Sequence, residues 1–310
     1  MPSWTELLAE IQAEAIKGRQ AHDRVRRRYL ALLHEHTGRN IIVYYSGWLQ
    51  EGRITGAHFG GFDINDLDKN GFMTAIHKLD RSKGVDLLLH TPGGSMTATE
   101  SLVDYLRAMF PGNIRAIVPQ LAMSGGTMIA LAANRVVMGK HSSLGPIDPQ
   151  INGLPAHGII EEFENAAKEI QKDPQRIPLW QPIIAKYHPT LIGECYKAAQ
   201  WSNQMVKQWL VTGMFKDEPD AEERADRAIA ELGSHALTLS HARHISLARA
   251  AEILGPHVAA LEDDQELQDL VLTVHHACIQ TLIETTAVKI IENHTGAAFI
   301  QSLSLGPQRE

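Results

Sequence analysis

The strongest constraint on the fold of this chain is a repeated alternation of short apolar runs with amphipathic segments. The apolar runs are residues 41–45, 85–90, 115–118 and 135–138, and patterns with helical spacing cover residues 69–80, 95–109 and 124–133. Short apolar strands that alternate with helices predict parallel βαβ units, whose connecting loops gather at the carboxyl ends of the strands. The expected class is therefore α/β.

Both ends of the chain have a helical pattern. Apolar positions recur at helical spacing over residues 3–36, and further helical patterns cover residues 157–172, 191–211, 221–232, 247–254 and 265–293. We therefore expect three parts. They are an N-terminal helical arm over residues 1–38, a core over residues 39–262 and a C-terminal helical extension over residues 263–310.

Composition excludes several classes of protein. The 310 residues carry a net charge of −7, without the clustered excess of Lys and Arg that a nucleic-acid surface needs. Cys195 and Cys278 follow neither a disulfide nor a zinc pattern, which indicates a reducing compartment. The chain also lacks a signal-peptide pattern and an apolar run long enough to span a bilayer. These features predict a cytoplasmic protein that binds no nucleic acid and has no membrane span.

Two glycine-rich turns stand where a strand gives way to a helix. We call residues 90–95 (HTPGGS) the glycine turn and residues 122–127 (AMSGGT) the serine turn. Backbone N–H groups at the start of a helix have no partner within the helix, and they favour a developing negative charge. Glycine also allows the backbone to approach an extended substrate closely. The two turns together are suited to acyl transfer.

Ser124 is the candidate nucleophile, and Gly93, Gly94 and Gly125 are the candidate oxyanion hole. A serine hydroxyl at this position would lie beside N–H donors that can hold the oxyanion of a tetrahedral intermediate. The serine turn nearly matches the G-x-S-x-G motif but has Ala122 at its first position, which disfavours a generic α/β-hydrolase. Each turn alone is also a typical helix start, so the prediction depends on the occurrence of both.

The chain resembles a known family in this region. The TPGGS and MSGG sequences of the two turns resemble those of the Clp protease proteolytic subunit. The sequences LGPIDPQ at residues 144–150 and SHARHIS at residues 240–246 are similar to the serine dehydrogenase proteinases, relatives of ClpP and of signal peptide peptidase A. The resemblance, extended over residues 40–300, implies a ClpP/crotonase-like spiral of short, mostly parallel strands. It also implies serine peptidase activity and assembly into a homo-oligomer.

The general base is less clear from the sequence. Alignment with ClpP brings Asp148 to the position of the family's catalytic histidine, and His241 lies beside the third position of the triad. Our hypothesis is that His241 is the base and that Asp148 orients it, because a neutral imidazole accepts a proton near pH 7. His157 is a second candidate, near the position of the lysine in signal-peptide-peptidase-like relatives, and Lys140 is a third.

The sequence predicts no metal and no other cofactor. Residues 66–71 resemble the start of a calcium loop, but His77 occupies the position of the required Glu. His241-x-x-His244 and His275-His276-x-Cys278 lack the spacing of a zinc motif. The chain has no nucleotide-binding glycine motif, so any ATP-driven unfolding of substrates requires another protein.

The sequence therefore predicts a serine peptidase that acts on peptides or proteins. Two alternatives remain. The chain could be a non-catalytic oligomeric scaffold, since the base is not obvious, or a crotonase-type acyl-CoA enzyme, since that family shares the fold and its paired backbone donors. The serine of the serine turn and the absence of a basic nucleotide-binding patch favour the peptidase.

Overall fold

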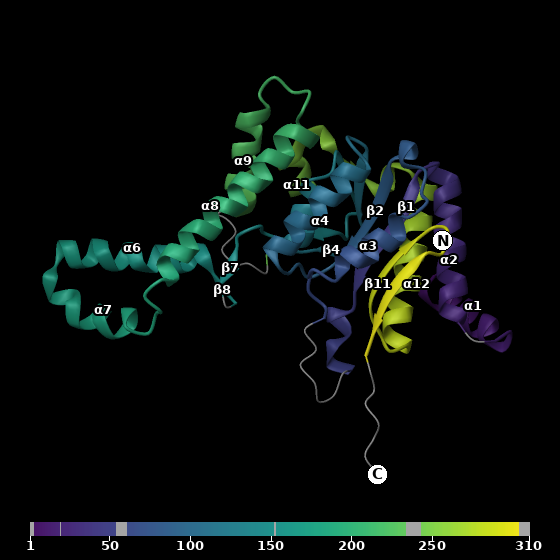
Figure 1. Ribbon diagram of the computed structural model, residues 1–310, viewed down its shortest axis with the longest axis horizontal. Coiled ribbons are helices and arrows are strands. Elements are labelled where there is room, and N and C mark those ends of the chain that lie inside the picture. Colours follow the sequence, from purple (N-terminus) through teal and green to yellow (C-terminus); the bar gives the residue numbers. More distant parts are fainter. Residues whose placement is uncertain (1–2, 19, 54–60, 152, 234–242, 304–310) are drawn as a thin grey trace, which may run out of the picture.

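A mixed, mainly parallel sheet forms the centre of the molecule (Figure 1). The computed structural model describes residues 3–18, 20–53, 61–151, 153–233 and 243–303. Within these residues seven strands form the sheet, in the order β10-β5-β3-β2-β1-β11-β12. The strands are β1 Asn40–Ser46, β2 Val85–His90, β3 Ile114–Val118, β5 Arg135–Met138, β10 Val258–Ala260, β11 Ala287–Asn293 and β12 Ala298–Ser302. The first five pair in parallel, which confirms the predicted α/β class with its parallel-rich sheet.

Helices cover both faces of the sheet, because alternate residues of each strand point to opposite sides. Tyr44 and Leu87 belong to the core on one face, and Val43 and Leu88 belong to the core on the other. The first face packs against α3 Asp68–Ile76, α4 Met96–Met109, α5 Gly125–Leu131, α8 Leu191–Trp209, α9 Ala221–Gly233 and α11 Leu247–Leu254. The second face packs against α2 Ala21–Thr37 and α12 Gln265–Glu284, and α1 Trp4–Ile16 packs outside these two helices.

The C-terminal part differs from the predicted helical extension. The helix expected over residues 265–293 ends at Glu284, and β11 and β12 then complete the sheet with antiparallel pairings. The segment after Glu284 contains the β-branched residues Thr285, Thr286, Val288, Ile290 and Ile291. Such residues lose rotamer freedom in a helix and pack well in a strand. The prediction of a continuous helix was therefore wrong.

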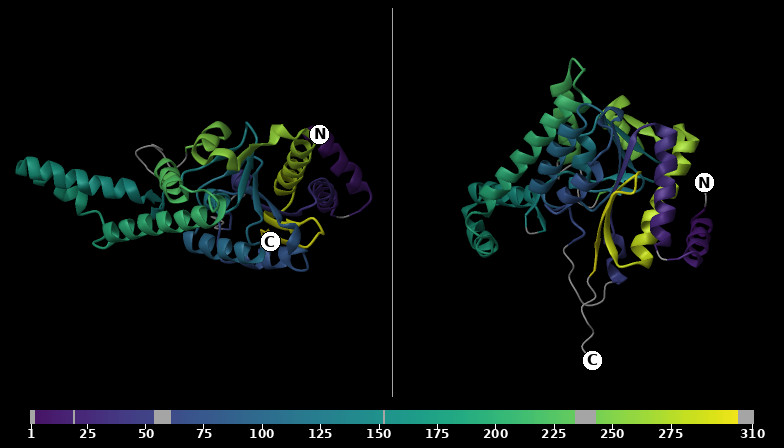
Figure 2. Two further views of the ribbon diagram at one scale, coloured as in Figure 1. Left: turned by 90° about the horizontal axis from the view of Figure 1, so that it is seen from above. Right: turned by 45° about the vertical axis from the view of Figure 1, so that its right-hand side comes forward.

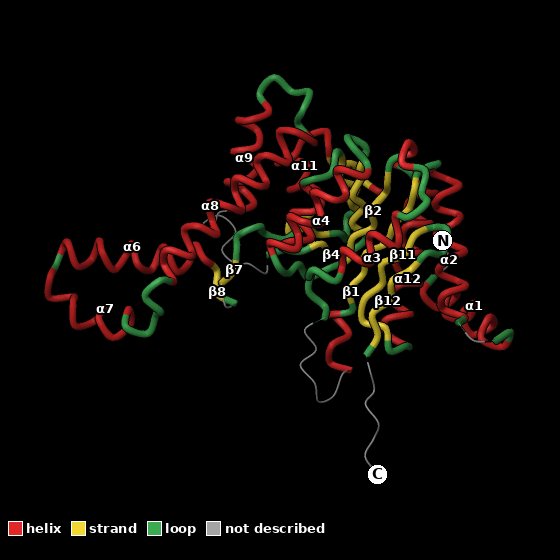
Figure 3. Tube along the Cα trace, in the orientation of Figure 1, coloured by secondary structure: helices red, strands yellow, loops and turns green. Residues whose placement is uncertain are grey.

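Two small sheets accompany the main one (Figure 3). The first consists of β4 Leu121–Ala122, β6 Ser143–Leu144 and β9 Ile245–Ser246, and the second of β7 Gln150–Ile151 and β8 Leu154–Pro155. Thr91, directly after β2, forms a parallel bridge to Ala122 of β4. This bridge brings the segment after β2 next to the segment that precedes α5.

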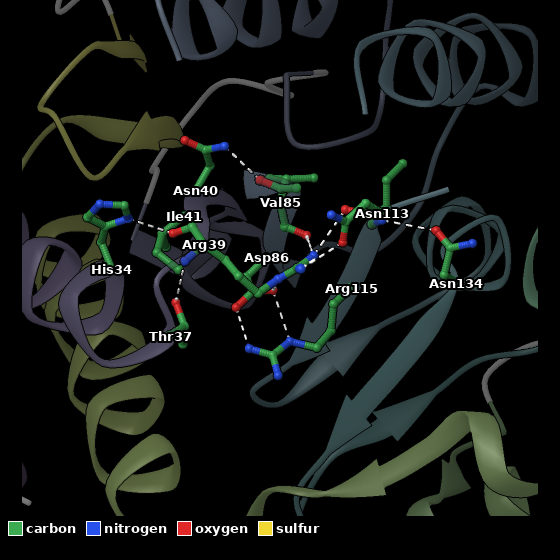
Figure 4. A network of polar contacts seen from close by, with 12 residues as sticks. His34, Thr37, Arg39, Asn40, Ile41, Val85, Asp86, Asn113, Arg115 and Asn134 are labelled. Carbon is green, nitrogen blue, oxygen red and sulfur yellow. Dashed lines mark hydrogen bonds and ion pairs between the residues drawn. The ribbon is translucent and has the colours of Figure 1, made fainter. Parts of the chain in front are cut away.

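A polar network holds the amino ends of the parallel strands (Figure 4). Asp86 is fully buried on β2, and it accepts hydrogen bonds from Arg39 at 2.5 Å and from Arg115 Nε at 2.9 Å. Arg39 also donates to the Asn113 side chain, whose Oδ1 lies 2.7 Å away. These contacts are at the start of β2. They therefore hold β1, β2 and β3 in register at the end opposite the glycine turn.

An arm of helices extends away from the sheet, as Figures 1 and 2 show from different directions. It contains α6 Ala156–Lys172, α7 Ile177–Ile184 and the first half of α8. A small apolar core joins α6 to α8 through Ile159, Ile160, Cys195 and Ala199, whereas α7 has no buried residue. None of the described helices has both the length and the apolar character needed to cross a bilayer.

Candidate active site

Ser124 lies between β4 and α5 in an unusual backbone conformation. Its φ is 49° and its ψ is −116°, a region that residues with a Cβ rarely adopt. Such a conformation costs roughly 1–3 kcal/mol and persists only where neighbouring contacts impose it. Hydrogen bonds from Met123 N to Thr91 O (3.0 Å) and from Met128 N to Ser124 O (3.0 Å) hold the residues on either side. The turn therefore presents Ser124 at the start of α5 in a fixed orientation.

The glycine turn approaches the serine turn too closely for a side chain. A Cβ built on Gly93, whose φ is +97°, would lie 2.7 Å from the Cβ of Ser124 and 2.9 Å from the N of Gly125. A Cβ on Gly125 would lie 3.5 Å from the N of Gly94. These distances explain why glycines occupy both turns, and they bring the backbones of the two turns together beside Ser124.

A third segment, residues 61–67, lies along the other side of the glycine turn. Ile64 N donates to Gly93 O at 2.7 Å, and Ser95 N donates to Ile64 O at 2.9 Å. A Cβ on Gly94 would lie only 2.3 Å from Ile64 N. The two hydrogen bonds form a short parallel bridge that fixes the peptide planes on both sides of Gly94.

Two polar groups at this junction have no hydrogen-bond partner within the described part of the chain. Among the described residues, no hydrogen bond involves the N–H of Gly94 or the hydroxyl of Ser124. Unsatisfied polar groups at a surface cavity are available to a ligand. Attack on a carbonyl group requires an available hydroxyl, and stabilisation of the resulting oxyanion requires an available N–H donor. Within the described residues, Ser124 and Gly94 supply these two groups.

A cavity of about 380 Å³ opens at the junction. One wall, which we call the oxyanion wall, consists of residues 92–96 together with Asp63, Ser124, Gly125 and Met128. The second wall, which we call the acidic wall, consists of residues 147–150 and Ala198. Ser124, which lines the cavity, is half-buried. The cavity therefore contains Ser124, the predicted glycines and one of the predicted triad residues, Asp148.

Asp148 is 1% exposed, although it lines the cavity. The backbone around it is held by α8, α9 and the start of α6. Ser202 Oγ donates to Ile147 O at 3.1 Å, Ile147 N donates to Leu232 O at 3.0 Å, and Ala156 N donates to Pro149 O at 2.9 Å. The carboxyl group of Asp148 is thus buried at a position fixed by three helices.

The candidates for the base fall in different places. His241, our first candidate, lies outside the described residues. His157 lies in the first turn of α6, half-buried, and does not line the cavity. Lys140 is exposed, and its backbone N–H donates to Glu262. Of these residues, His241 remains a prediction, and neither of the other two is among the residues that line the cavity.

Buried ionisable residues lie on both faces of the sheet near the glycine turn, which itself begins with His90. On one face of the sheet, Lys289 binds Asp68, and burial lowers the pKa of Lys289. On the other face, His90 packs against Trp48 with ring centroids 4.4 Å apart, and burial lowers the pKa of His90 to about 3. Neither ring nitrogen of His90 has a hydrogen-bond partner among the described residues. His90 is therefore neutral near pH 7.

No metal centre emerges from these residues. In the part of the chain that the structure describes, no three His, Cys, Asp or Glu side chains are arranged to hold a metal ion. Asp68, part of the calcium-like sequence, points instead to Lys289 and Tyr44. His275 and His276 lie on α12, where His275 accepts or donates a hydrogen bond with the Tyr45 hydroxyl at 3.2 Å.

Sequence reasoning missed the part played by Asp63 and Ile64. Both precede α3, and Ile64 supplies the backbone bridge to the glycine turn. Their sequence has no catalytic motif, because the contact uses main-chain atoms and the carbonyl of Asp63.

A parallel-rich sheet in which a serine turn faces a glycine turn is the architecture of ClpP-like proteins. The family model for the ClpP-like SDH-type serine proteinases matches residues 10–181, which is over half of the chain. The chain belongs to this family, as the sequence motifs predicted.

Two relatives from Methanocaldococcus jannaschii are similar over a shorter region. Uncharacterized protein MJ0137 is 40% identical over 106 residues, which cover 34% of this chain and 37% of the relative. Uncharacterized protein MJ1495 is 35% identical over 106 residues, or 34% of this chain and 36% of the relative. The chain thus matches little more than a third of the length of either curated relative.

Proposed function

We propose that this protein is a serine peptidase that cleaves peptide bonds through an acyl-enzyme on Ser124. The observation that carries the proposal is the strained backbone of Ser124 directly against Gly93, at the edge of a cavity that also contains Asp148. The family of ClpP-like serine proteinases supports the same class of reaction. The natural protein substrates and the assembly of copies into a homo-oligomer belong to the proposal, as does the spiral arrangement typical of the ClpP/crotonase fold.

In the proposed reaction, the Ser124 oxygen attacks the carbonyl carbon of the scissile peptide bond. Its proton passes to His241, and the carbonyl oxygen becomes an oxyanion that accepts hydrogen bonds from the N–H groups of Gly94 and Gly125. Collapse of this intermediate breaks the C–N bond, and the leaving amine takes the proton from His241. Water then attacks the acyl-enzyme by the same route and releases the acid.

The catalytic base needs an orienting partner, and Asp148 has the properties of one. A buried carboxylate beside a histidine selects the imidazole tautomer that can accept the serine proton, and it stabilises the imidazolium that forms. Asp148 is buried and lines the same cavity as Ser124 and the proposed oxyanion donors. The order Ser124, Asp148, His241 along the chain then differs from that of ClpP, while the roles are the same.

The test is covalent labelling with a fluorophosphonate, followed by mass spectrometry of the labelled peptide. We expect label on Ser124, and we expect Ser124→Ala to lose the label and at least roughly 10³-fold in peptide hydrolysis. Ser95→Ala is the matched control, because Ser95 lines the same cavity and caps α4. It should still be labelled.

Label at another residue, or full hydrolysis by Ser124→Ala, would contradict the proposal. An inert but folded wild-type protein would instead favour an oligomeric scaffold. Turnover of acyl-CoA thioesters without hydrolysis of peptides would favour a crotonase-type enzyme. A comparison of His241→Ala with His157→Ala decides the base: we expect the first to lose activity and the second to keep it.

A further inference from the structure

A buried network of Lys289, Asp68 and Tyr44 lies behind the glycine turn. The Lys289 side chain is 0% exposed and that of Asp68 is 1% exposed. Lys289 Nζ donates to Asp68 Oδ1 at 2.8 Å and to Oδ2 at 3.0 Å, and the Tyr44 hydroxyl donates to Oδ2 at 2.6 Å. The three residues come from β11, the start of α3 and β1.

Stability alone explains such a network poorly. Removing two charges from water is costly, and well-packed apolar residues often replace a buried ion pair with no loss of stability. A second buried pair joins Glu292, on the same strand as Lys289, to Arg26 of α2. The Lys289–Asp68 pair differs because it forms hydrogen bonds with the backbone of Asp63 and Asn65, in the segment next to the glycine turn.

One branch of the network leads to the segment that holds the glycine turn. Lys289 Nζ also donates to Asp63 O at 2.8 Å, and Asp68 Oδ2 accepts from Asn65 N at 3.0 Å. These two contacts fix the residues on both sides of Ile64. Ile64 in turn binds Gly93 O and Ser95 N through its own backbone.

Tyr44 holds Asp68 in place, and the turn has a hydrogen bond of its own. Burial and Asp68 raise the pKa of Tyr44 well above its usual value, so the Tyr44 hydroxyl keeps the proton that it donates to Asp68. Thr91 Oγ1 accepts a hydrogen bond from Gly93 N at 3.2 Å. Through Ile64 the network thus reaches the carbonyl of Gly93, which directly precedes the proposed oxyanion donor Gly94.

We propose that Lys289, Asp68 and Tyr44 are positioning residues that orient the N–H of Gly94 towards the oxyanion. This inference rests on the proposed peptidase function for its catalytic consequence. A shift of the Gly94 peptide plane changes the position of a donor without changing the shape of the acidic wall. The network therefore acts on the transition state more than on the binding of the substrate.

The first test variant replaces the ion pair with apolar residues, Lys289→Met with Asp68→Leu. The second, Tyr44→Phe, removes one hydroxyl and keeps the ring that packs on Phe72; it serves if the first fails to fold. Glu292→Gln is the matched control, because Glu292 is also buried on β11 but binds Arg26 and Arg27. Each protein is first compared with the wild type in thermal unfolding.

Two measurements are made on each folded variant: kcat and KM for a peptide, and hydrogen exchange at the amides of Gly93 and Ser95. For the double variant we expect faster exchange at both amides and a kcat lowered by about 10²-fold with KM nearly unchanged. Tyr44→Phe should show the same pattern with a smaller decrease. Glu292→Gln should match the wild type in both measurements, whatever its stability.

Exchange at Gly93 and Ser95 that matches the wild type, or that changes equally in the control, overturns the inference. So does faster exchange with an unchanged kcat in an active protein. An inactive wild type contradicts the proposed function instead, and it is recognised by the absence of turnover and of Ser124 labelling before any variant is compared.

Discussion

The two walls of the cavity are built in different ways. The oxyanion wall consists largely of backbone, packed so closely that a Cβ on Gly94 would lie 2.3 Å from Ile64 N. The acidic wall contains the buried Asp148, and residues 147–150 lie on a segment that leads into the helical arm. The first wall has no room for a side chain at Gly93 or Gly94. The second wall contains Asp148 and Gln150, whose functional groups can be replaced one at a time by substitution.

The largest effect should come from the acidic wall, because we propose that a single group there, the Asp148 carboxyl, orients the base. Asp148→Asn keeps the shape of the side chain and removes its charge, so it should lower kcat by roughly 10⁴-fold through loss of the correct imidazole tautomer. Peptide hydrolysis of the folded variant measures this. Asp173→Asn, an exposed carboxyl of the arm, is the control. Activity within about threefold of the wild type would exclude Asp148 from the triad.

Next in size is a change to the oxyanion wall. Gly94→Ala places a methyl group against the backbone of Ile64, at a φ of +153° that side chains rarely adopt. The turn must move, and we expect kcat/KM to fall by roughly 10²–10³-fold, the value of one oxyanion donor. Gly193→Ala on α8 is the control, because its Cβ would meet nothing within 4 Å. Equal activity of the two variants would show that the wall accommodates a side chain.

A smaller effect concerns the histidine behind the oxyanion wall. The pKa of His90 in the fold is about 3, below its ordinary value of 6.5, so the unfolded chain binds its proton first as the pH falls. Stability is therefore lost between pH 6.5 and about 3, by roughly 1.4 kcal/mol per pH unit. His90→Leu should remove this part of the pH dependence, or about 2 kcal/mol at pH 5.

Urea unfolding between pH 7 and pH 4.5 measures this slope. His188→Gln, on the exposed arm, should leave the slope unchanged. An identical slope in His90→Leu and the wild type would mean that His90 takes up a proton in the folded protein.

The smallest effect should come from the tip of the arm. Leu179 is 52% exposed on α7 and lies outside the residues that line the cavity. Leu179→Ser should therefore change unfolding by no more than about 0.5 kcal/mol and leave hydrolysis of a short peptide unaltered. A clear change in KM for such a peptide would extend the acidic wall to the arm.

The alternation of strands and helices was predictable because its periodicity is local. The strand over residues 85–90 and the helix Leu247–Leu254 occur where the apolar pattern placed them. The two-residue strands β4, β6 and β9 are too short to show any period, and only their pairing reveals them. The β-branched residues after Glu284 contained the signal for β11, which a continuing apolar pattern concealed.

The candidate site also contains residues that local sequence patterns predicted and residues that they did not. Ser124 and the glycines lie within two short motifs, so their proximity followed from the parallel arrangement of β2 and the segment before α5. Ile64 could not be predicted, because its main chain makes the contact. Nor could Lys289, which lies 221 positions from Asp68 along the sequence. Buried charge pairs of this kind are specified by the folded topology and leave no local pattern.

The position of β11 in the sheet determines when its contacts can form during synthesis of the chain. This strand pairs with β1, although almost the whole chain separates the two, and contacts so distant in sequence form late. While the polypeptide emerges from the ribosome, residues 61–67 and the glycine turn are made long before Lys289 reaches them. A nascent chain thus lacks the contacts of Lys289 with Asp63 and Asp68, and the proposed peptidase site is complete only once synthesis has passed β11.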